Sequence, residues 1–514
     1  MTQMAMPNKN IKKMRGKVKK IALIEPIRNF SPNMGLITLA AIPKLAGKEV
    51  KILYMFDYEY KSGDQLSNYS LKKIKDFDPD IIGVGFLSAE WHAAKVVIER
   101  LATAFDKIIV AGGRHPSSFP KDVLTWGADF VIVGEGETAF EELINCIENN
   151  GAGLESSVGI AFYKEDGAFH LNPRLKETAN LDIIPAYHLI PYQNFINTKL
   201  GVVGRYLKSG WLATSRGCFS KCIYCRDNNF GGHLRFRSMD AVFDDIRLQL
   251  SNYDLDCFYI VDDMFAVKEK RVIEFCDRFI AIQKEFNKML YFAATARTDT
   301  LTKPMVNAME KAGCTQLTFG VESGSPKIHD ILNTNKSCTT IVPAFEMLKE
   351  SEIDTFVNFI IGVPGENEDD INLTLKIIDS IKPTTVGVTF LTPYPGTRLY
   401  DLACNNNWLD GDMKKEFVYR HNYKPQLNVG IDPSLLLNRA KRIYKKTSRK
   451  TILNVFTRHE SIELIFDVIK MMFKHPVKVL DTIKSILTGD IDKFKTKYRH
   501  LLYVNTGLTI NNGL

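Results

Sequence analysis

The chain has 514 residues, of which 45% are hydrophobic and 25% are charged, and its formal net charge is +8. This length favours about three domains, and the composition is that of an ordinary globular protein with a sizeable core. Nine cysteines are too few for a secreted scaffold held together by disulfides. The basic N-terminus lacks the apolar segment of a signal peptide, and no apolar run reaches the about 18 residues of a spanning helix. These features predict a cytoplasmic protein.

Much of the positive charge lies near the two ends of the chain. Residues 1–19 form a basic tail, and residues 441–450 form a second basic run, K-R-I-Y-K-K-T-S-R-K. Solvated tails explain such runs more simply than an anionic partner does, and no nucleic-acid partner is expected.

Short apolar runs alternate with amphipathic segments over residues 20–150. Five strands with interleaved helices predict a doubly wound parallel sheet, a Rossmann-like domain whose ligand crevice lies at the carboxyl ends of the strands. Glycine or proline follows several of the runs, as such a crevice needs. The predicted strands are 21–27, 50–55, 81–86, 107–113 and 130–137, and two of the predicted helices are 89–105 and 137–149.

Residues 151–205 are predicted to connect this domain to the next one. They contain a hairpin pattern with Asp166 and Gly167 at the turn, followed by a stretch with little regular structure.

A second α/β pattern occupies residues 206–407. Six strand–helix units at a spacing of 26 to 46 residues predict a full barrel or a partial (β/α)6 barrel, and chemistry in such barrels gathers at the carboxyl ends of the strands. The predicted strands are 211–215, 257–263, 290–297, 316–323, 356–364 and 386–393, and two of the predicted helices are 268–286 and 367–381.

The pattern changes again in residues 408–514, where helices with apolar faces are predicted at 461–470 and 477–487. A helical cap on the barrel is the simpler interpretation. Peripheral contact with an anionic membrane surface, or with a lipid-like substrate, is the alternative.

The stretch T-S-R-G-C-F-S-K-C-I-Y-C places Cys218, Cys222 and Cys225 on a loop directly after the first barrel strand. Such a group of thiolates in a cytosolic protein favours a metal site. Structural zinc normally has four ligands, and the nearest histidine, His233, gives no sign of being the fourth. Three cysteines suit a 4Fe–4S cluster with one iron left open, with zinc and purely structural cysteines as the alternatives.

This loop resembles the signature of the radical S-adenosylmethionine (radical SAM) enzymes, in which Tyr224 corresponds to an aromatic residue near the adenine. In that family the open iron chelates the amino and carboxylate groups of S-adenosylmethionine, and the reduced cluster transfers an electron to the sulfonium. The resulting 5′-deoxyadenosyl radical abstracts hydrogen from a substrate. The resemblance implies a 4Fe–4S cluster, S-adenosylmethionine, a small-molecule substrate and an electron donor such as flavodoxin or ferredoxin.

Later strand ends also resemble the cofactor-binding positions of that family. Asp262 and Asp263 stand where the family often has a Gly-Gly-Glu-like turn facing the methionine amine. Arg297 can pair with the methionine carboxylate through a bidentate contact, and a surface ion pair is its alternative role.

Two further strand ends complete the comparison with the barrel of that family. Glu322 and Ser323 match a position that contacts the ribose or the amine, although a buried capping glutamate would look the same. Gly362 and Gly365 lie in I-I-G-V-P-G-E, which resembles the adenine-side stretch and would let the backbone approach the ligand. The stretch 392–397 resembles the end of the sixth strand.

The first domain resembles the cobalamin-binding domain that precedes the barrel in many of these enzymes, so the resemblance extends over residues 20–402. No D-x-H-x-x-G motif is present. Of the available histidines, His92 looks ordinary, and His115 lies nearer the crevice, where helix entry or loop packing explains it as well. Cobalt then either lacks a protein lower ligand, or the domain no longer binds cobalamin. A dinucleotide site is disfavoured, because no G-x-G-x-x-G follows the first strand. The candidate cobalamin contacts are Gly85, Ser88, Gly112, Gly113, Gly134 and Glu135.

The resemblance implies a cobalamin-dependent methyltransferase acting at an unactivated carbon. A cyclase or rearrangement enzyme of the same branch, and a cluster- or cobalamin-based sensor without catalysis, are the alternatives. Methylthiotransferases and enzymes with an auxiliary cluster are disfavoured, because Cys146 and Cys404 are the only cysteines in the regions where their extra ligands would lie. No motif identifies the substrate.

Overall fold

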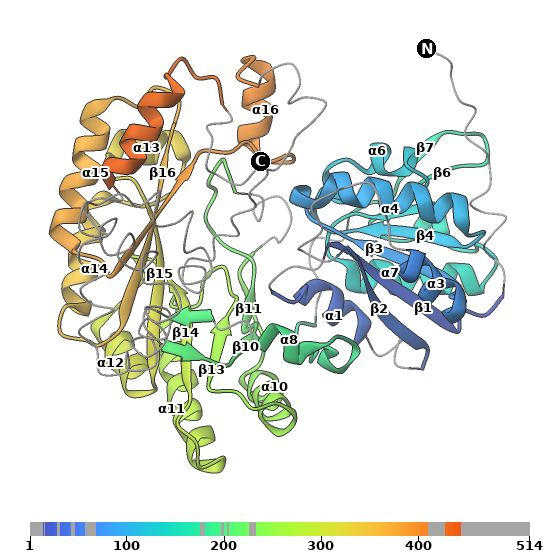
Figure 1. Ribbon diagram of the computed structural model, residues 1–514, viewed down its shortest axis with the longest axis horizontal. Coiled ribbons are helices and arrows are strands. Elements are labelled where there is room, and N and C mark those ends of the chain that lie inside the picture. The colour runs from blue at the N-terminus through green and yellow to red at the C-terminus, as the bar shows by residue number, and fades with distance from the viewer. Residues whose placement is uncertain are drawn as a thin grey trace, which may run out of the picture.

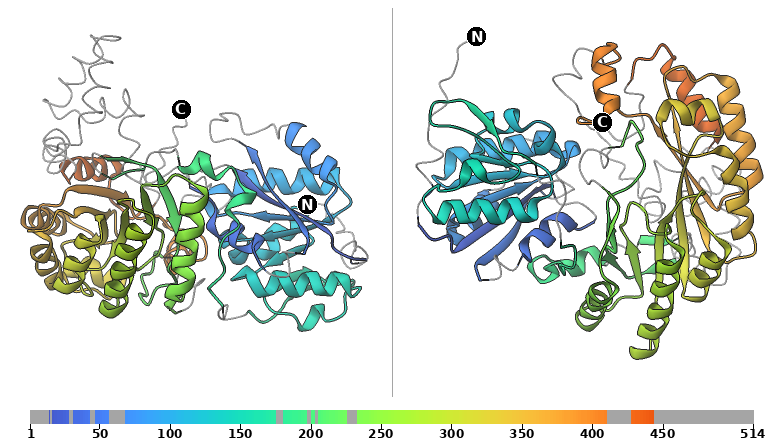
Figure 2. Two further views of the ribbon diagram at one scale, coloured as in Figure 1. Left: turned by 90° about the horizontal axis from the view of Figure 1, so that it is seen from below. Right: turned by 180° about the vertical axis from the view of Figure 1, so that it is seen from behind.

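The computed structural model describes residues 14, 16–27, 31–42, 47–56, 68–174, 180–196, 200–202, 205–225, 233–409 and 427–443. Two α/β units lie side by side in it (Figure 1), and two further views show the same arrangement (Figure 2). The helices predicted at 461–470 and 477–487, and most of the two basic runs, lie outside the described residues. None of the described helices is long and apolar enough to cross a membrane.

The first unit is built on a seven-stranded sheet with the order β2-β1-β3-β4-β5-β6-β7. Its first five strands are parallel, as the sequence predicts, and this part of the order is that of a doubly wound fold. The strands are β1 (Lys20–Ile27), β2 (Glu49–Phe56), β3 (Ile81–Gly85), β4 (Ile108–Gly112), β5 (Phe130–Ile132), β6 (Ile160–Tyr163) and β7 (Phe169–Leu171).

Buried side chains of the strands point to both faces of this sheet, and helices cover each face. One core contains Leu36 of α1 and Phe140 of α7, whereas a separate core on the other face contains Val97 of α4 and Val123 of α6. The helices of this unit are α1 (Met34–Ala40), α3 (Asn68–Phe77), η2 (Ser88–Glu90), α4 (Trp91–Ala104), α5 (Arg114–Ser118), α6 (Pro120–Thr125), α7 (Gly136–Glu148) and η3 (Leu154–Ser156).

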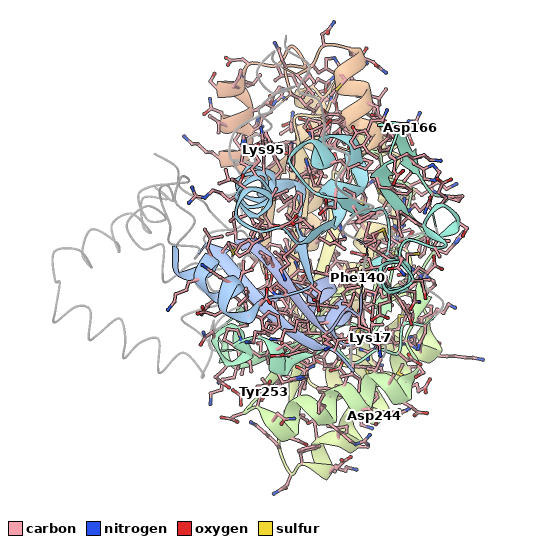
Figure 3. All side chains as sticks on the ribbon, turned by 90° about the vertical axis from the view of Figure 1, so that its right-hand side faces the viewer. Lys17, Lys95, Phe140, Asp166, Asp244 and Tyr253 are labelled. Atoms are coloured by element: carbon pink, nitrogen blue, oxygen red, sulfur yellow. The ribbon has the colours of Figure 1, made fainter. Side chains whose placement is uncertain are left out.

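The hairpin β6–β7 extends the first sheet rather than standing apart in the connector. Strand β6 is antiparallel to β5, and β7 is antiparallel to β6. Asp166 lies exposed at the turn, where its carboxylate accepts a hydrogen bond from the Ala168 amide (2.9 Å; Figure 3). The sheet is therefore mixed, with two antiparallel strands after the five parallel ones.

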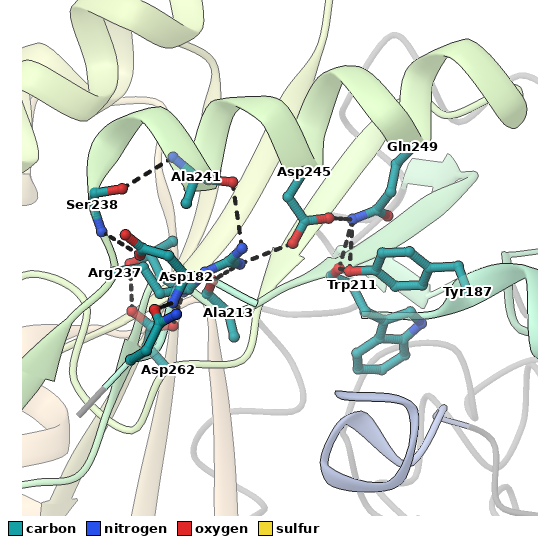
Figure 4. Close-up of polar contacts among 12 residues, drawn as sticks. Asp182, Tyr187, Trp211, Ala213, Arg237, Ser238, Ala241, Asp245, Gln249 and Asp262 are labelled. Carbon is teal, nitrogen blue, oxygen red and sulfur yellow. Dashed lines mark hydrogen bonds and ion pairs between the residues drawn. The ribbon is translucent and has the colours of Figure 1, made fainter. Parts of the chain in front are cut away.

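The rest of the connector packs against the edge of the second unit. Residues 180–186 are irregular, and η4 (Tyr187–Leu189) and α8 (Tyr192–Ile196) follow them. The Tyr192 hydroxyl accepts a hydrogen bond from the Trp211 amide (2.8 Å), and the Tyr187 hydroxyl donates one to the Trp211 carbonyl (3.2 Å; Figure 4). Farther along, β8 (Leu200–Val202) and β9 (Arg205–Leu207) pair with each other.

The second unit is built on six parallel strands in the order β10-β13-β14-β15-β16-β17. Because β10 and β17 do not pair with each other, the sheet is an open, partial barrel, as predicted. Its strands are β10 (Ser209–Leu212), β13 (Cys257–Ile260), β14 (Tyr291–Ala296), β15 (Cys314–Glu322), β16 (Asp354–Ile361) and β17 (Thr385–Phe390).

Helices cover the outer face of this sheet through a core rich in aromatic side chains. Phe275 and Phe279 of α11 pack on Phe292 of β14, with ring centroids 5.5 and 5.3 Å away. The helices are α10 (Met239–Asn252), α11 (Glu269–Glu285), α12 (Lys303–Lys311), α13 (Pro326–Leu332), η5 (Cys338–Thr340), α14 (Ile341–Leu348), α15 (Glu368–Ile381) and α16 (Arg398–Asn405), followed by a helix at 433–443.

Candidate functional site

The three clustered cysteines lie on a loop that leaves the barrel directly after its first strand. A ribbon of two short strands, β11 (Ser215–Arg216) and β12 (Arg235–Phe236), closes the base of this loop. Residues 217–225 carry all three cysteines, and none of the three forms a disulfide. We refer to residues 217–225 as the cluster loop.

The donor set of the cluster loop fits an iron–sulfur cluster. Three thiols stand within eight residues, and the Ser220 amide donates a hydrogen bond to the Cys218 sulfur (3.4 Å). The Met264 sulfur lies 3.0 Å from the same atom. Among the described residues, no three His, Cys, Asp or Glu side chains are arranged to hold a metal ion as they stand. The cluster loop therefore matches an iron–sulfur site in the chemistry of its ligands and in its position after the first barrel strand.

Asp262 anchors the start of the cluster loop. Its buried carboxylate accepts hydrogen bonds of 2.6 Å from the Thr214 amide, the Thr214 hydroxyl and the Ser215 hydroxyl. Burial raises the pKa of Asp262, against the lowering effect of these donors. The sequence led us to expect this side chain at a cofactor amine, but the structure commits it to the loop. Asp263, in contrast, is exposed.

Arg297 holds the middle of the cluster loop. Its guanidinium makes a bidentate contact with Asp299 (2.8 and 2.6 Å), contacts the Ser220 hydroxyl and lies over the Phe219 ring at 5.0 Å. Burial favours a higher pKa for Asp299, but the Arg297 charge outweighs burial and the pKa is lowered. The bidentate partner in the structure is thus a neighbouring carboxylate, where the sequence led us to expect the methionine carboxylate. The alternative that the sequence offered was a surface ion pair, whereas the ion pair in the structure is buried.

Glu322 lies in a strained backbone conformation at the end of β15. Its φ is 65°, in the left-handed region that residues other than glycine rarely adopt and that is often found at functional sites. The buried carboxylate lies 3.5 Å from the Lys336 ammonium group. Burial and then the Glu322 charge raise the pKa of Tyr224, and burial raises the pKa of Cys222. A carboxylate, a phenol and a cluster thiol therefore share one buried corner.

Ser323, next to Glu322, is used within its own turn. Its hydroxyl lies 3.2 Å from the Thr374 hydroxyl and accepts a hydrogen bond from the Ser325 amide (3.1 Å). The sequence predicts that Glu322 and Ser323 both contact the cofactor. In the structure the Glu322 carboxylate lies beside Lys336, whereas the Ser323 hydroxyl contacts Thr374 and Ser325.

The turn after β16 is shaped by two glycines and a buried glutamate. Gly362 and Gly365 have φ values of 80° and 79°, which only glycine adopts readily. The Gly362 amide donates to the Glu366 carboxylate (2.8 Å), and Arg439 of the helix at 433–443 lies 3.7 Å from the same carboxylate. A side chain at Gly362 would meet Leu436 of that helix. Glu366 and Arg439 thus complete the turn after β16, and the sequence did not lead us to expect a role for either residue.

Glu366 gives the protein a pH-dependent stability that can be measured. Burial raises its pKa from 4.5 to about 7, although the Gly362 amide and Arg439 lower it. The unfolded chain loses this proton at a lower pH than the folded protein does. The stabilisation is therefore fully present below pH 4.5 and is lost as the pH rises to about 7. The total change is about 3 kcal/mol.

A Glu366→Gln variant should keep its stability between pH 5 and pH 8, whereas the natural protein loses part of its own. Denaturant unfolding at several pH values measures the difference. Glu346, an exposed glutamate paired with Lys349 at 3.3 Å, provides the control variant Glu346→Gln. Parallel pH profiles for the natural protein and Glu366→Gln would contradict this account.

The candidate cobalamin contacts of the first unit gather at one edge of its sheet. Gly85 and Gly112 end neighbouring parallel strands, and Ser88 is buried just beyond the first of these. Gly113 has a φ of 108°, and a Cβ there would lie 2.5 Å from the Phe86 carbonyl oxygen, so only glycine fits. Gly134 follows β5 at the same edge. A Cβ at Gly134 would also lie 2.7 Å from the Arg174 side chain, so other parts of the protein pack closely against the backbone at this edge.

Glu135 is engaged in a way that the sequence did not reveal. Its buried carboxylate accepts hydrogen bonds from Arg235, one of them at 3.2 Å, and lies 3.6 Å from Arg216. Both arginines belong to the ribbon at the base of the cluster loop. We predicted Glu135 as a cobalamin contact, but in the structure its carboxylate pairs with the other unit.

The two candidate histidines belong to an aromatic cluster. The His115 ring is buried and packs against Phe86 (5.6 Å) and Trp126 (5.9 Å) between ring centroids. His92 stacks on Trp91 at 3.6 Å. His115 lies in the first turn of α5, which agrees with helix entry, one of the ordinary roles that the sequence offered for it.

Family models match both units. The model of the B12 binding domain matches residues 21–144, and that of the radical SAM superfamily matches residues 212–378. An uncharacterised methyltransferase of Pyrococcus horikoshii is 28% identical over 410 residues, which cover 76% of this chain and 85% of that protein.

A second relative and a solved structure complete the comparison. The anaerobic magnesium-protoporphyrin IX monomethyl ester cyclase of Cereibacter sphaeroides is 25% identical over 354 residues, covering 66% of this chain and 55% of that protein. The radical S-adenosylmethionine methyltransferase TsrM of Kitasatospora setae has a TM-score of 0.62 at 16% identity and covers 76% of each chain. At that identity the likeness concerns the fold.

The two family models together imply three cofactors, namely a 4Fe–4S cluster, S-adenosylmethionine and cobalamin. The three thiols on the cluster loop fit the iron–sulfur cluster. The glycines at the sheet edge of the first unit are the candidate contacts of cobalamin. The chain is therefore a cobalamin-dependent radical SAM enzyme, with a B12-binding domain ahead of its radical SAM domain.

Proposed function

We propose that this enzyme transfers a methyl group to an unactivated carbon of a small-molecule substrate. The observation that carries this proposal is that the relative named as a methyltransferase is matched over 85% of its length and 76% of this chain. The direct contact between Glu135 of the B12-binding domain and Arg235 at the base of the cluster loop supports it further. Methyl transfer between two cofactors needs such proximity.

The chain itself contributes binding, orientation and exclusion of water. When bound, the cofactors supply a carbon-centred radical and a methyl group, with electrons from a donor such as flavodoxin or ferredoxin. Cys218, Cys222 and Cys225 would hold the cluster. Glu322 and Lys336 provide a buried pair of opposite charges, which suits the charged amino acid end of S-adenosylmethionine.

Isotope labelling tests the proposal without knowledge of the substrate. The reconstituted enzyme, with cluster and cobalamin, is reduced anaerobically with S-adenosylmethionine that carries a CD₃ group. We expect the CD₃ group to be recovered on the bound cobalamin, with a matching amount of S-adenosylhomocysteine beside 5′-deoxyadenosine in mass spectra. A Cys222→Ala variant is expected to form no 5′-deoxyadenosine.

The second candidate is radical cyclisation, which the similarity to the Cereibacter sphaeroides cyclase favours. That reaction would yield 5′-deoxyadenosine without S-adenosylhomocysteine. This product pattern, with cobalamin bound, would rule out methyl transfer.

A further inference from the structure

The ribbon at the base of the cluster loop places two arginines side by side. Strands β11 and β12 are antiparallel, and Arg216 stands directly opposite Arg235. Like charges directly opposite each other destabilise an antiparallel pair. A ribbon that pairs so few residues has little other stabilisation, so it needs negative charge from elsewhere.

Two glutamates of the B12-binding domain supply that charge. Glu135 contacts Arg235 through both carboxylate oxygens, and Glu137 lies 2.8 Å from Arg216. Both acids belong to the turn from β5 into α7, and Glu137 in the first helical turn also interacts favourably with the helix dipole. The four residues alternate in charge across the boundary between the two domains.

Burial makes this arrangement costly to break. The Glu135 side chain is 4% exposed and the Arg235 side chain is 16% exposed. Burial lowers the pKa of Arg216, but the two glutamates outweigh it, and the pKa lies above its ordinary value. Removing one member therefore leaves a poorly solvated charge without its partner.

We propose that Arg216, Arg235, Glu135 and Glu137 form an ion-pair clamp that orders the cluster loop through docking of the B12-binding domain. The clamp joins a turn next to the crevice-edge residue Gly134 to a strand that ends two residues before Cys218. These four are positioning residues. They set where the cluster loop stands relative to the sheet edge that carries Gly112 and Gly134, and they make the order of the loop depend on the domain contact. This role holds whichever radical reaction follows.

Hydrogen exchange on the full-length, reconstituted enzyme tests the clamp without reference to catalysis. In a Glu135→Gln/Glu137→Gln variant, peptides that cover the ribbon should exchange about tenfold faster, while the helix α11 keeps its protection. Pulsed electron paramagnetic resonance of the reduced cluster and cob(II)alamin should show a broader distribution of distances. The control is Glu285→Gln, which removes an exposed ion pair with Arg247 (2.9 Å) away from the boundary.

A double-mutant cycle separates pairing from general damage. Once Arg216→Gln has removed the like-charge contact within the ribbon, adding Glu137→Gln should change exchange far less than it does in the natural protein. Additive effects would overturn the clamp. Natural exchange rates in the double glutamine variant would also overturn it. So would loss of cobalamin affinity in Glu135→Gln but not in Arg235→Gln, since Glu135 would then act on the cofactor itself.

Discussion

Replacing Cys222 with alanine should abolish reductive cleavage of S-adenosylmethionine. Two remaining thiolates cannot hold a cluster that needs three, and the corresponding variants of Cys218 and Cys225 should behave in the same way. Iron content and the yield of 5′-deoxyadenosine after anaerobic reduction measure the effect. Both should fall to background, while far-ultraviolet circular dichroism stays unchanged, because the loop contributes little regular structure.

Cys338→Ala provides a matched control, since Cys338 is a partly exposed free thiol in η5, outside the cluster loop. This variant should retain its iron and its cleavage activity. Full cleavage by any one of the three loop variants would show that the cluster is held elsewhere.

Replacing Asp245 with alanine should destabilise the barrel by about 3–5 kcal/mol, the usual result of breaking a buried ion pair. The Asp245 carboxylate is fully buried, lies 2.8 Å from Arg237 and accepts a further hydrogen bond from Gln249 (2.9 Å; Figure 4). Without it, the Arg237 guanidinium remains buried with only carbonyl partners. Arg237 also donates to the Ala213 carbonyl (2.8 Å), just before the cluster loop, so iron loading should fall as well.

Chemical denaturation followed by circular dichroism measures this loss. The neighbouring Asp244 has a side chain that is 63% exposed and pairs with Arg247 at 3.3 Å. Asp244→Ala should therefore change the free energy of unfolding by less than about 1 kcal/mol. Equal effects of the two substitutions would show that the buried pair contributes no more than a surface pair.

The fold was accessible from the sequence because each strand is a short apolar run with a helical pattern beside it. The doubly wound sheet and the barrel-like second sheet follow from that alternation. Whether the barrel is open does not follow from it, because that depends on whether β10 pairs with β17. The hairpin at 160–171 was also predicted, but its place in the first sheet was not. Nothing in its own residues states which strand it pairs with, because that depends on the free edge of β5.

The candidate site was less accessible, because its side chains have partners far away in the chain. The cysteine spacing is local and therefore readable. Glu135 and Arg235, in contrast, are 100 positions apart, and their contact exists only once two domains dock. Arg297 illustrates a different difficulty. Its bidentate partner, Asp299, is only two residues away in the sequence. The sequence alone could not separate this partner from the expected cofactor carboxylate, because both are carboxylates.

The connector has a consequence for any attempt to study the barrel alone. Strand β10 lies at an edge of the open sheet, and the hydroxyls of Tyr187 and Tyr192 occupy the carbonyl and the amide of Trp211 there. A fragment that began at residue 206 would lack both tyrosines and would present a bare strand edge, which is a ready template for self-association. The smallest fragment worth isolating therefore starts before residue 180. The connector joins the two domains and also covers a strand edge that could otherwise aggregate.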